Sequence, residues 1–205
     1  MQKLKNTSDK NSFREESIKL LKREAKRSSY LKSKKIESTL EALIKDLNPK
    51  SILFYLPLQM EANISRLIFK LRREKEIFVP FMEGVSFKMV RFRLPLFKKR
   101  FNILEPNNSF FKNRNIDLAI VPIVGMDRDF KRVGFGKGMY DRFFENLPSK
   151  PIVVFVQLKA CVSSAKLTKK HDIRGDFLVT SNLLLKYRKD RFDSKYINKY
   201  FHSFT

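Results

Sequence analysis

The chain has 205 residues, enough for one large α/β domain or two small ones, and 44 Lys and Arg against 21 Asp and Glu give a net charge of +23. No run of five or six like charges and no Arg-Gly repeat occurs, so we favour a lysine-rich solvated surface over a nucleic-acid site. Because the sequence shows neither a membrane-length apolar run nor the apolar centre of a signal peptide, we expect no membrane span and no secretory signal. The single cysteine, Cys161, excludes a disulfide framework within the chain. We therefore expect a cytoplasmic protein.

Apolar periodicity predicts an alternation of helices and strands along the chain. In chain order these are helices over residues 18–25 and 36–47, a strand over 51–57, a helix over 64–71, strands over 76–80, 86–93 and 116–122, a helix over 139–147, strands over 151–157 and 176–181, and a terminal helix beginning in 182–190. The alternation is typical of an α/β sandwich with a mostly parallel sheet. We expect a single domain over residues 1–205, in which residues 183–205 form a basic C-terminal extension.

The stretch RVGFGKGMYDRFF, residues 132–144, contains half of the six glycines of the chain, at the alternate positions 134, 136 and 138. Glycine is costly in backbone entropy, so such clustering indicates a sharp path or a close approach to another group. The stretch follows a strand that is apolar throughout and precedes a helix. In α/β folds this is where ligands bind and where backbone N–H groups can hold phosphate.

Charged side chains in the same stretch fit a phosphate site. Arg132 and Lys137 could neutralise phosphate oxygens, and Asp141, in the first turn of the predicted helix, could hold Mg²⁺. Neither the Walker loop nor the dinucleotide fingerprint matches the glycine spacing. On these grounds alone, a phosphate cradle and a simple tight turn remain open.

Six segments in order resemble one known family. They are KNSFR (10–14), YLPLQMEANISRLI (55–68), FNILEP (101–106), IDLAIVPIVGMD (116–127), RVGFGKGMYDR (132–142) and KKHDIRGDFLVTS (169–181). Together they cover roughly residues 10–182 and resemble the motifs of the 5-formyltetrahydrofolate cyclo-ligase family, also named methenyltetrahydrofolate synthetases. The chain departs from the family pattern at Met139, where a tyrosine is usual, and near Phe130, where a glycine is usual.

The resemblance implies a monomeric enzyme with a three-layer α/β/α sandwich similar to that of sugar-phosphate isomerases and CoA transferases. It implies that 5-formyltetrahydrofolate and MgATP are the ligands, and that 5,10-methenyltetrahydrofolate, ADP and phosphate are the products. By the route that it implies, the γ-phosphate moves to the formyl oxygen, N10 attacks the activated carbon, and phosphate leaves. Such chemistry requires positioning and neutralisation of charge.

The family motifs also carry site residues onto this chain. ATP-binding residues implied by the resemblance are Lys10, Arg14, Arg132, Val133, Gly134, Phe135, Gly136, Lys137, Gly138, Met139 and Tyr140, of which Arg132, Lys137 and Tyr140 would be catalytic. Folate would be bound by Leu56, Glu61, Phe101 and Met139, with Glu61 accepting hydrogen bonds from the pterin edge. Mg²⁺ would be bound by Asp141 and Asp172.

Each assignment has a simpler alternative. Glu61 could favour a helix N-terminus, and Leu56 and Phe101 could be core residues. His171 is interpreted as incidental and Cys161 as structural. Two rival functions stay open: a basic RNA-binding protein whose glycine stretch is only a turn, and a catalytically inactive folate-binding relative.

Overall fold

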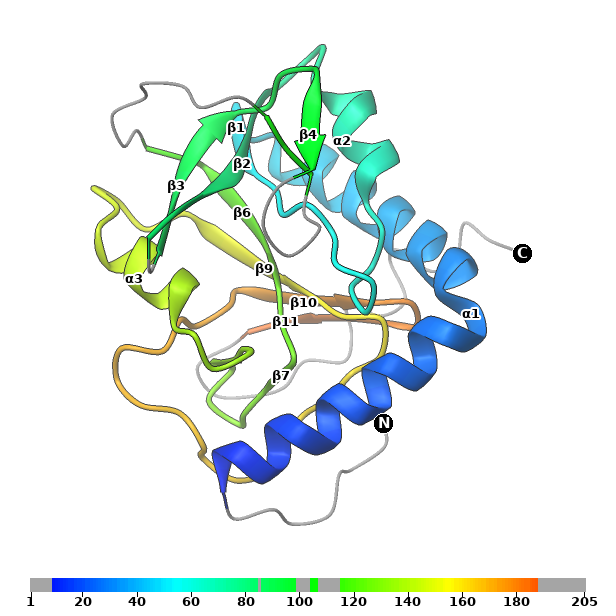
Figure 1. Cartoon of the computed structure of the whole chain (residues 1–205), viewed down its shortest axis with the longest axis vertical. Coiled ribbons are helices and arrows are strands. Elements are labelled where there is room, and N and C mark those ends of the chain that lie inside the picture. Colours follow the sequence, from blue (N-terminus) through cyan, green and yellow to red (C-terminus); the bar gives the residue numbers. More distant parts are fainter. Residues whose placement is uncertain (1–8, 85, 99–103, 107–114, 188–205) are drawn as a thin grey trace.

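A seven-stranded sheet forms the centre of the protein in the computed structural model, which describes residues 9–84, 86–98, 104–106 and 115–187 (Figure 1). Its strand order is β11-β10-β9-β6-β1-β2-β3. The bounds are β1 Ser51–Leu53, β2 Glu76–Glu83, β3 Ser86–Arg91, β6 Leu118–Pro122, β9 Ile152–Val156, β10 Phe177–Thr180 and β11 Leu183–Lys186. The five central strands are parallel to one another, and the edge strands β3 and β11 are antiparallel to their neighbours. The prediction of a mostly parallel sheet is confirmed.

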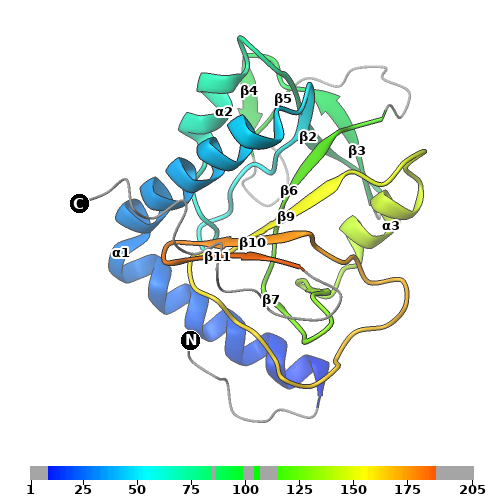
Figure 2. The same cartoon turned by 180° about the vertical axis from the view of Figure 1, so that it is seen from behind.

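Helices cover both faces of this sheet (Figures 1 and 2). The long helix α1 (Lys10–Leu47) and α2 (Ser65–Leu71) pack on one face, and α3 (Met139–Glu145) packs on the other. Strand β6 shows how the sequence supports both layers, because Leu118 and Ile120 face the cluster under α1 while Ala119 and Val121 face the cluster under α3. The three-layer sandwich predicted for the chain is therefore present.

The N-terminal helix is longer than the periodicity predicted. The two expected helices over 18–25 and 36–47 are parts of the single helix α1, which Asp9 caps by accepting hydrogen bonds from the N–H groups of Asn11 and Ser12. Ser28 alone leaves helical geometry inside it, with φ −158° and ψ 34°. The apolar pattern breaks around this kink, which is why two helices were predicted. The helix ends at Asn48, in the left-handed region, just before Pro49.

The predicted terminal helix beginning in 182–190 is wrong. Leu183–Lys186 form β11, which pairs antiparallel with β10. Leucine favours helices, but here Leu184 and Leu185 bury their side chains on opposite faces of the sheet, and this packing overrides propensity. The predicted basic extension over 183–205 therefore starts too early, since its first residues belong to the sheet. The part of that extension from residue 188 onward lies outside the described residues.

Two small antiparallel pairs complete the fold, namely β4 (Leu96–Lys98) with β5 (Leu104–Pro106) and β7 (Gly125–Met126) with β8 (Arg132–Val133). The second pair follows β6 and leads the chain into the glycine stretch. Among the described residues no helix is long and apolar enough to cross a membrane.

Candidate active site

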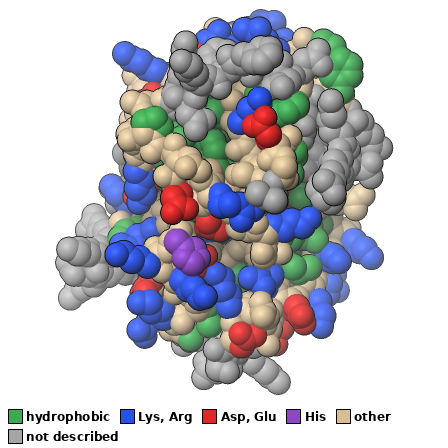
Figure 3. Space-filling model, turned by 60° about the vertical axis from the view of Figure 1, so that its left-hand side comes forward, with side chains coloured by type: hydrophobic (Ala, Val, Ile, Leu, Met, Phe, Trp, Pro, Cys, Tyr) green, Lys and Arg blue, Asp and Glu red, His purple; other side chains and the backbone are tan. Residues whose placement is uncertain are grey.

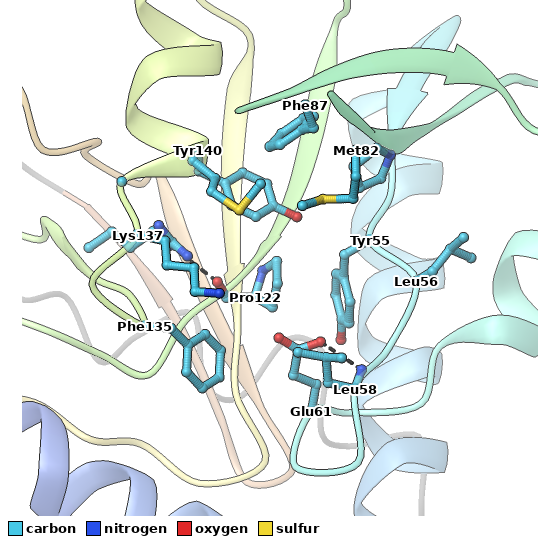
Figure 4. A pocket seen from close by; sticks show the side chains of 14 residues that line it. Tyr55, Leu56, Leu58, Glu61, Met82, Phe87, Pro122, Phe135, Lys137 and Tyr140 are labelled. Atoms are coloured by element: carbon cyan, nitrogen blue, oxygen red, sulfur yellow. Dashed lines mark hydrogen bonds between the residues drawn. The ribbon is translucent and has the colours of Figure 1, made fainter. Parts of the chain in front are cut away.

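A cavity of about 310 Å³ opens where the parallel strands β1, β2 and β6 end. It is lined by Tyr55, Leu56, Leu58 and Glu61 after β1, by Pro80, Met82 and Phe87 from β2 and β3, and by Pro122, Arg132, Phe135, Lys137, Gly138, Met139 and Tyr140. In Figure 4, Phe135 and Lys137 stand on one side of the cavity and Tyr55, Leu58 and Glu61 on the opposite side. This is the edge at which α/β proteins bind ligands.

The glycines of the stretch 132–144 have two separate structural reasons. Gly136 and Gly138 adopt positive φ angles of +94° and +59°, which L side chains rarely adopt. At Gly134, a Cβ atom would stand 2.6 Å from the Arg132 Nη1 atom, so only glycine lets that guanidinium lie against the backbone. The glycine stretch thus forms a sharp turn and also leaves room for the buried guanidinium of Arg132 to pack against its backbone.

Arg132 is the buried cation of the site. Its Nε donates to the Pro122 carbonyl oxygen at 3.2 Å, and its guanidinium carbon lies 4.7 Å from the centre of the Tyr140 ring. Burial lowers the pKa of Arg132, although nearby acidic groups, Asp141 foremost, oppose this effect. Burial likewise raises the pKa of Tyr140 well above its usual range, so its hydroxyl stays neutral.

The first turn of α1 reaches the glycine stretch. Arg14 donates from Nε to the Gly134 carbonyl oxygen at 2.8 Å and from Nη1 to Asn11 Oδ1 at 2.6 Å. The structure thus brings Arg14 to a loop that lies 120 residues away in sequence. Arg14 lies behind the loop rather than in the lining of the cavity.

Lys10, one turn earlier, forms an ion pair with Asp172. The Lys10 ammonium lies 2.8 Å from both carboxylate oxygens, and the Lys169 N–H donates to Oδ2 at 2.6 Å. Burial favours a raised pKa for Asp172, but these hydrogen bonds outweigh it and the pKa is lowered. Asp172 is therefore ionised, as a carboxylate that binds a metal must be, but in the ligand-free protein its charge is paired with Lys10.

Asp141 contacts the residue that follows Asp172, because its Oδ1 accepts a hydrogen bond from the Ile173 N–H at 3.3 Å. The described residues hold no group of three or more His, Cys, Asp or Glu suited to a metal. Two carboxylates are nevertheless a common protein contribution to Mg²⁺, whose other ligands are waters and substrate phosphates. The donor chemistry thus fits Mg²⁺ that arrives with a nucleotide.

Glu61 is the acidic group of the cavity. Its Oε2 accepts the Leu58 N–H at 2.9 Å, while its own N–H donates to the Leu58 carbonyl oxygen at 2.9 Å. Burial raises the pKa of Glu61 to about 7, against the opposing effects of the Leu58 N–H and the Arg132 charge. Helix α2 begins only at Ser65 and has no side-chain cap. The helix-start interpretation of Glu61 is therefore not supported by the geometry.

Only part of the predicted site lines the cavity. Its lining includes the predicted residues Leu56, Glu61, Arg132, Phe135, Lys137, Gly138, Met139 and Tyr140, but not Lys10, Arg14, Gly134, Gly136, Asp141 or Asp172. Val133 is fully buried in the core and does not line the cavity. Phe101 lies outside the described residues. Sequence reasoning missed Tyr55, Leu58, Pro80, Met82, Phe87 and Pro122, which line the cavity from the ends of strands. Only the position of Pro122, at the end of the buried run before the glycine stretch, could have indicated a lining residue.

Apolar and aromatic side chains shape the rest of the cavity. Phe87 packs edge-on against Tyr140 with ring centres 4.9 Å apart, and stacks on Phe143 of α3 at 4.4 Å. Figure 3 shows one face of the molecule, on which Lys and Arg side chains are spread with acidic side chains among them. The positive charge seen there is dispersed.

Comparisons with known proteins identify the family of this chain. The model of the 5-formyltetrahydrofolate cyclo-ligase family matches residues 6–174. Two relatives named 5-formyltetrahydrofolate cyclo-ligase are similar: one from Mycoplasma pneumoniae, 28% identical over 68% of this chain and 79% of its own length, and one from Haemophilus influenzae, 24% identical over 63% and 74%.

Solved structures are similar as well. A 5,10-methenyltetrahydrofolate synthetase from Aquifex aeolicus superposes with a TM-score of 0.73 and 28% identity, over 89% of this chain and 94% of that one. A second, from Mycoplasma pneumoniae, has a TM-score of 0.63 and 21% identity over 84% and 99%, and supports the fold alone. Since the family model spans most of its length, this chain belongs to the 5-formyltetrahydrofolate cyclo-ligase family.

Proposed function

We propose that this protein uses MgATP to convert 5-formyltetrahydrofolate into 5,10-methenyltetrahydrofolate, with release of ADP and phosphate. The observation that carries the proposal is the pairing of two opposed groups in one cavity of about 310 Å³. On one side lies the Glu61 carboxyl, suited to the donor edge of a pterin. On the other lies the glycine stretch with Arg132 and Lys137, suited to phosphate.

The nucleotide would bind along the glycine stretch. Glycine lets phosphate approach backbone N–H groups closely, and Arg132 and Lys137 would neutralise its oxygens. Arg14 reaches the same loop from α1 through its contact with Gly134, and Lys10, one turn earlier, pairs with Asp172. Phe135, 38% exposed at the mouth of the cavity, offers an apolar surface beside the phosphate site.

Asp141 and Asp172 would hold Mg²⁺ together with phosphate oxygens and water. The bound ion would supply charge neutralisation at the phosphates. For Asp172 to bind it directly, the carboxylate must share or exchange the Lys10 ammonium. Water between the ion and Asp172 would satisfy the same role without breaking that pair.

The folate would lie with its pterin edge on Glu61 and its rings between apolar walls. A carboxylate accepts from two donors at once, which matches adjacent N–H groups on a pterin. Leu56 and Met139 both line the cavity. Because the hydroxyl of Tyr140 stays neutral, it can donate a hydrogen bond to an oxygen of the reacting group.

The reaction balances as two displacements. The formyl oxygen attacks the γ-phosphorus, the bond from phosphorus to the bridging oxygen breaks, and ADP leaves with that electron pair. N10 then attacks the activated formyl carbon, and the carbon–oxygen bond breaks to release phosphate, while N10 loses its proton. Arg132 and Lys137 would stabilise the charge on the transferred group in the first step.

The test is an absorbance assay for methenyltetrahydrofolate with the full chain, 5-formyltetrahydrofolate, and MgATP present or absent. We expect product only with MgATP. Folate binding without product would favour the inactive relative, which the unusual Met139 keeps open. Absence of both, with salt-dependent binding to RNA, would favour the nucleic-acid alternative.

A further inference from the structure

We propose that Tyr55 is a positioning residue that holds the loop carrying Glu61, a role that rests on the proposed function. The Tyr55 hydroxyl donates to the carbonyl oxygen of Ala62, the residue after Glu61, at 2.8 Å. Tyr55 is 2% exposed and Ala62 is 1% exposed, so water does not compete for this bond.

Apolar packing of Leu56, Ala62 and Ile64 holds the ends of the loop, but the turn that carries Glu61 lies between them. After β1 ends at Leu53, no helix or strand forms until α2 begins at Ser65. Within it, the two hydrogen bonds between Leu58 and Glu61 close a turn but do not anchor that turn to the sheet. Tyr55 supplies such an anchor. It directly follows Phe54, whose N–H makes the last sheet-type hydrogen bond, to the Phe78 carbonyl oxygen.

A second anchor holds the far end of the loop. Ser33 of α1 accepts a hydrogen bond from the Asn63 N–H at 2.9 Å. This contact fixes the approach to α2 without Tyr55. Removing the Tyr55 hydroxyl should therefore loosen the turn that carries Glu61 while α2 stays in place.

The geometry distinguishes this role from direct contact with substrate. The Tyr55 ring forms part of the cavity wall, and its hydroxyl points toward the loop of Leu58 and Glu61 (Figure 4). That hydroxyl already donates its one proton to Ala62, so it has none for a ligand. The hydrogen bond that it donates can therefore affect folate only through the position of the loop that carries Glu61.

Tyr55→Phe keeps the ring and removes only the hydroxyl. The matched control is Ser181→Ala, which also removes a hydroxyl that donates to a buried backbone carbonyl, that of Leu158 at 3.3 Å, but does so away from the loop. We expect calorimetry to show about tenfold weaker binding of 5-formyltetrahydrofolate to Tyr55→Phe, with MgATP affinity unchanged within about twofold. The control should change neither affinity. Unchanged folate affinity in Tyr55→Phe, whatever its melting temperature, would overturn the proposal.

Hydrogen exchange of the ligand-free proteins gives a second readout that needs no activity. In Tyr55→Phe, exchange should accelerate in the peptide covering residues 56–63, and in the control it should not accelerate there. Unchanged exchange in that peptide would also overturn the role of Tyr55. Failure of the wild-type protein to bind 5-formyltetrahydrofolate would instead refute the proposed function, so the two failures are distinguishable.

Discussion

Replacing Glu61 with glutamine should stabilise the ligand-free protein and weaken its binding of folate. The amide can still accept the hydrogen bond from the Leu58 N–H, since it keeps one carbonyl oxygen. The substitution also removes the Glu61 carboxyl, whose ionisation is made unfavourable by burial, as the pKa of about 7 for Glu61 indicates. The wild-type residue would then be retained for binding at a cost in stability.

The magnitude follows from the pKa shift. Below pH 4.5 the carboxyl is protonated in both states, so the ionisation of Glu61 contributes nothing to the pH dependence. Between pH 4.5 and about 7 the unfolded chain releases the proton and the folded protein retains it, so stability falls as pH rises. At about 1.4 kcal/mol for each pKa unit, the full penalty above that window is roughly 3 kcal/mol.

The assay is urea unfolding of wild type and Glu61→Gln at several pH values from 5 to 8. Other titrating groups are common to both proteins, so the difference in free energy of unfolding isolates Glu61. We expect the variant to gain stability relative to wild type as pH rises, by roughly 3 kcal/mol across the window. A difference that does not change with pH would refute the reasoning.

Folate binding to wild type and Glu61→Gln tests the second claim, that the Glu61 carboxyl binds the pterin. Two pterin donors would favour the ionised carboxyl, so binding near pH 7 should release a fraction of a proton from wild type and none from Glu61→Gln. Calorimetry in buffers of different ionisation heat measures that release. The variant should also lose more affinity for folate than for MgATP. Equal loss of both would contradict the pterin contact.

Further variants probe the phosphate side of the cavity. Lys137→Ala or Arg132→Ala should reduce kcat/KM by an amount corresponding to about 2–4 kcal/mol while circular dichroism shows an intact fold, and near wild-type activity in both would exclude the loop assignment. Met139→Tyr should leave turnover within about tenfold, whereas Tyr140→Phe should lose more if its hydroxyl acts in the transition state. An inactive wild type that Met139→Tyr activates would establish the inactive-relative alternative. Lys10→Ala should raise KM for MgATP more than KM for folate, and the reverse order would contradict its assignment.

The fold was largely predictable because each strand has its own pattern. The run 116–122 became β6, buried on both faces, and the half-exposed run 86–93 became β3 with its edge position. The C-terminal strand β11 was not predictable in the same way. Its leucines and lysine suit a helix, and only pairing with β10 selects the extended form.

The part of the site built from the glycine stretch was predictable, because clustered glycines are rare in a sequence. The part built from apolar and aromatic side chains was not, because such residues also fill the core. Three glycines in five residues are rare enough to indicate a special backbone, and all three have a structural reason. Tyr55 and Met82 resemble any core side chain in sequence. They line the cavity only because the chain leaves the sheet after β1 while β2 continues to Glu83. The sequence of β1 or of β2 taken alone does not indicate that the two strands end at different points and leave a cavity between them.

The cations around the glycine stretch already have oxygen partners in the ligand-free protein. Lys10 binds the Asp172 carboxylate, Arg14 binds the Gly134 carbonyl oxygen, and Arg132 binds that of Pro122. A buried cation without such partners would be costly, so these contacts hold the side chains in place before a nucleotide arrives. The hydrogen-bond partners of Arg14 and Arg132 named here are neutral carbonyl groups, whereas that of Lys10 is a carboxylate. We therefore expect Arg14 and Arg132 to donate to phosphate while they keep their hydrogen bonds to the Gly134 and Pro122 carbonyl oxygens. The Lys10 ammonium, in contrast, must be shared between phosphate and Asp172.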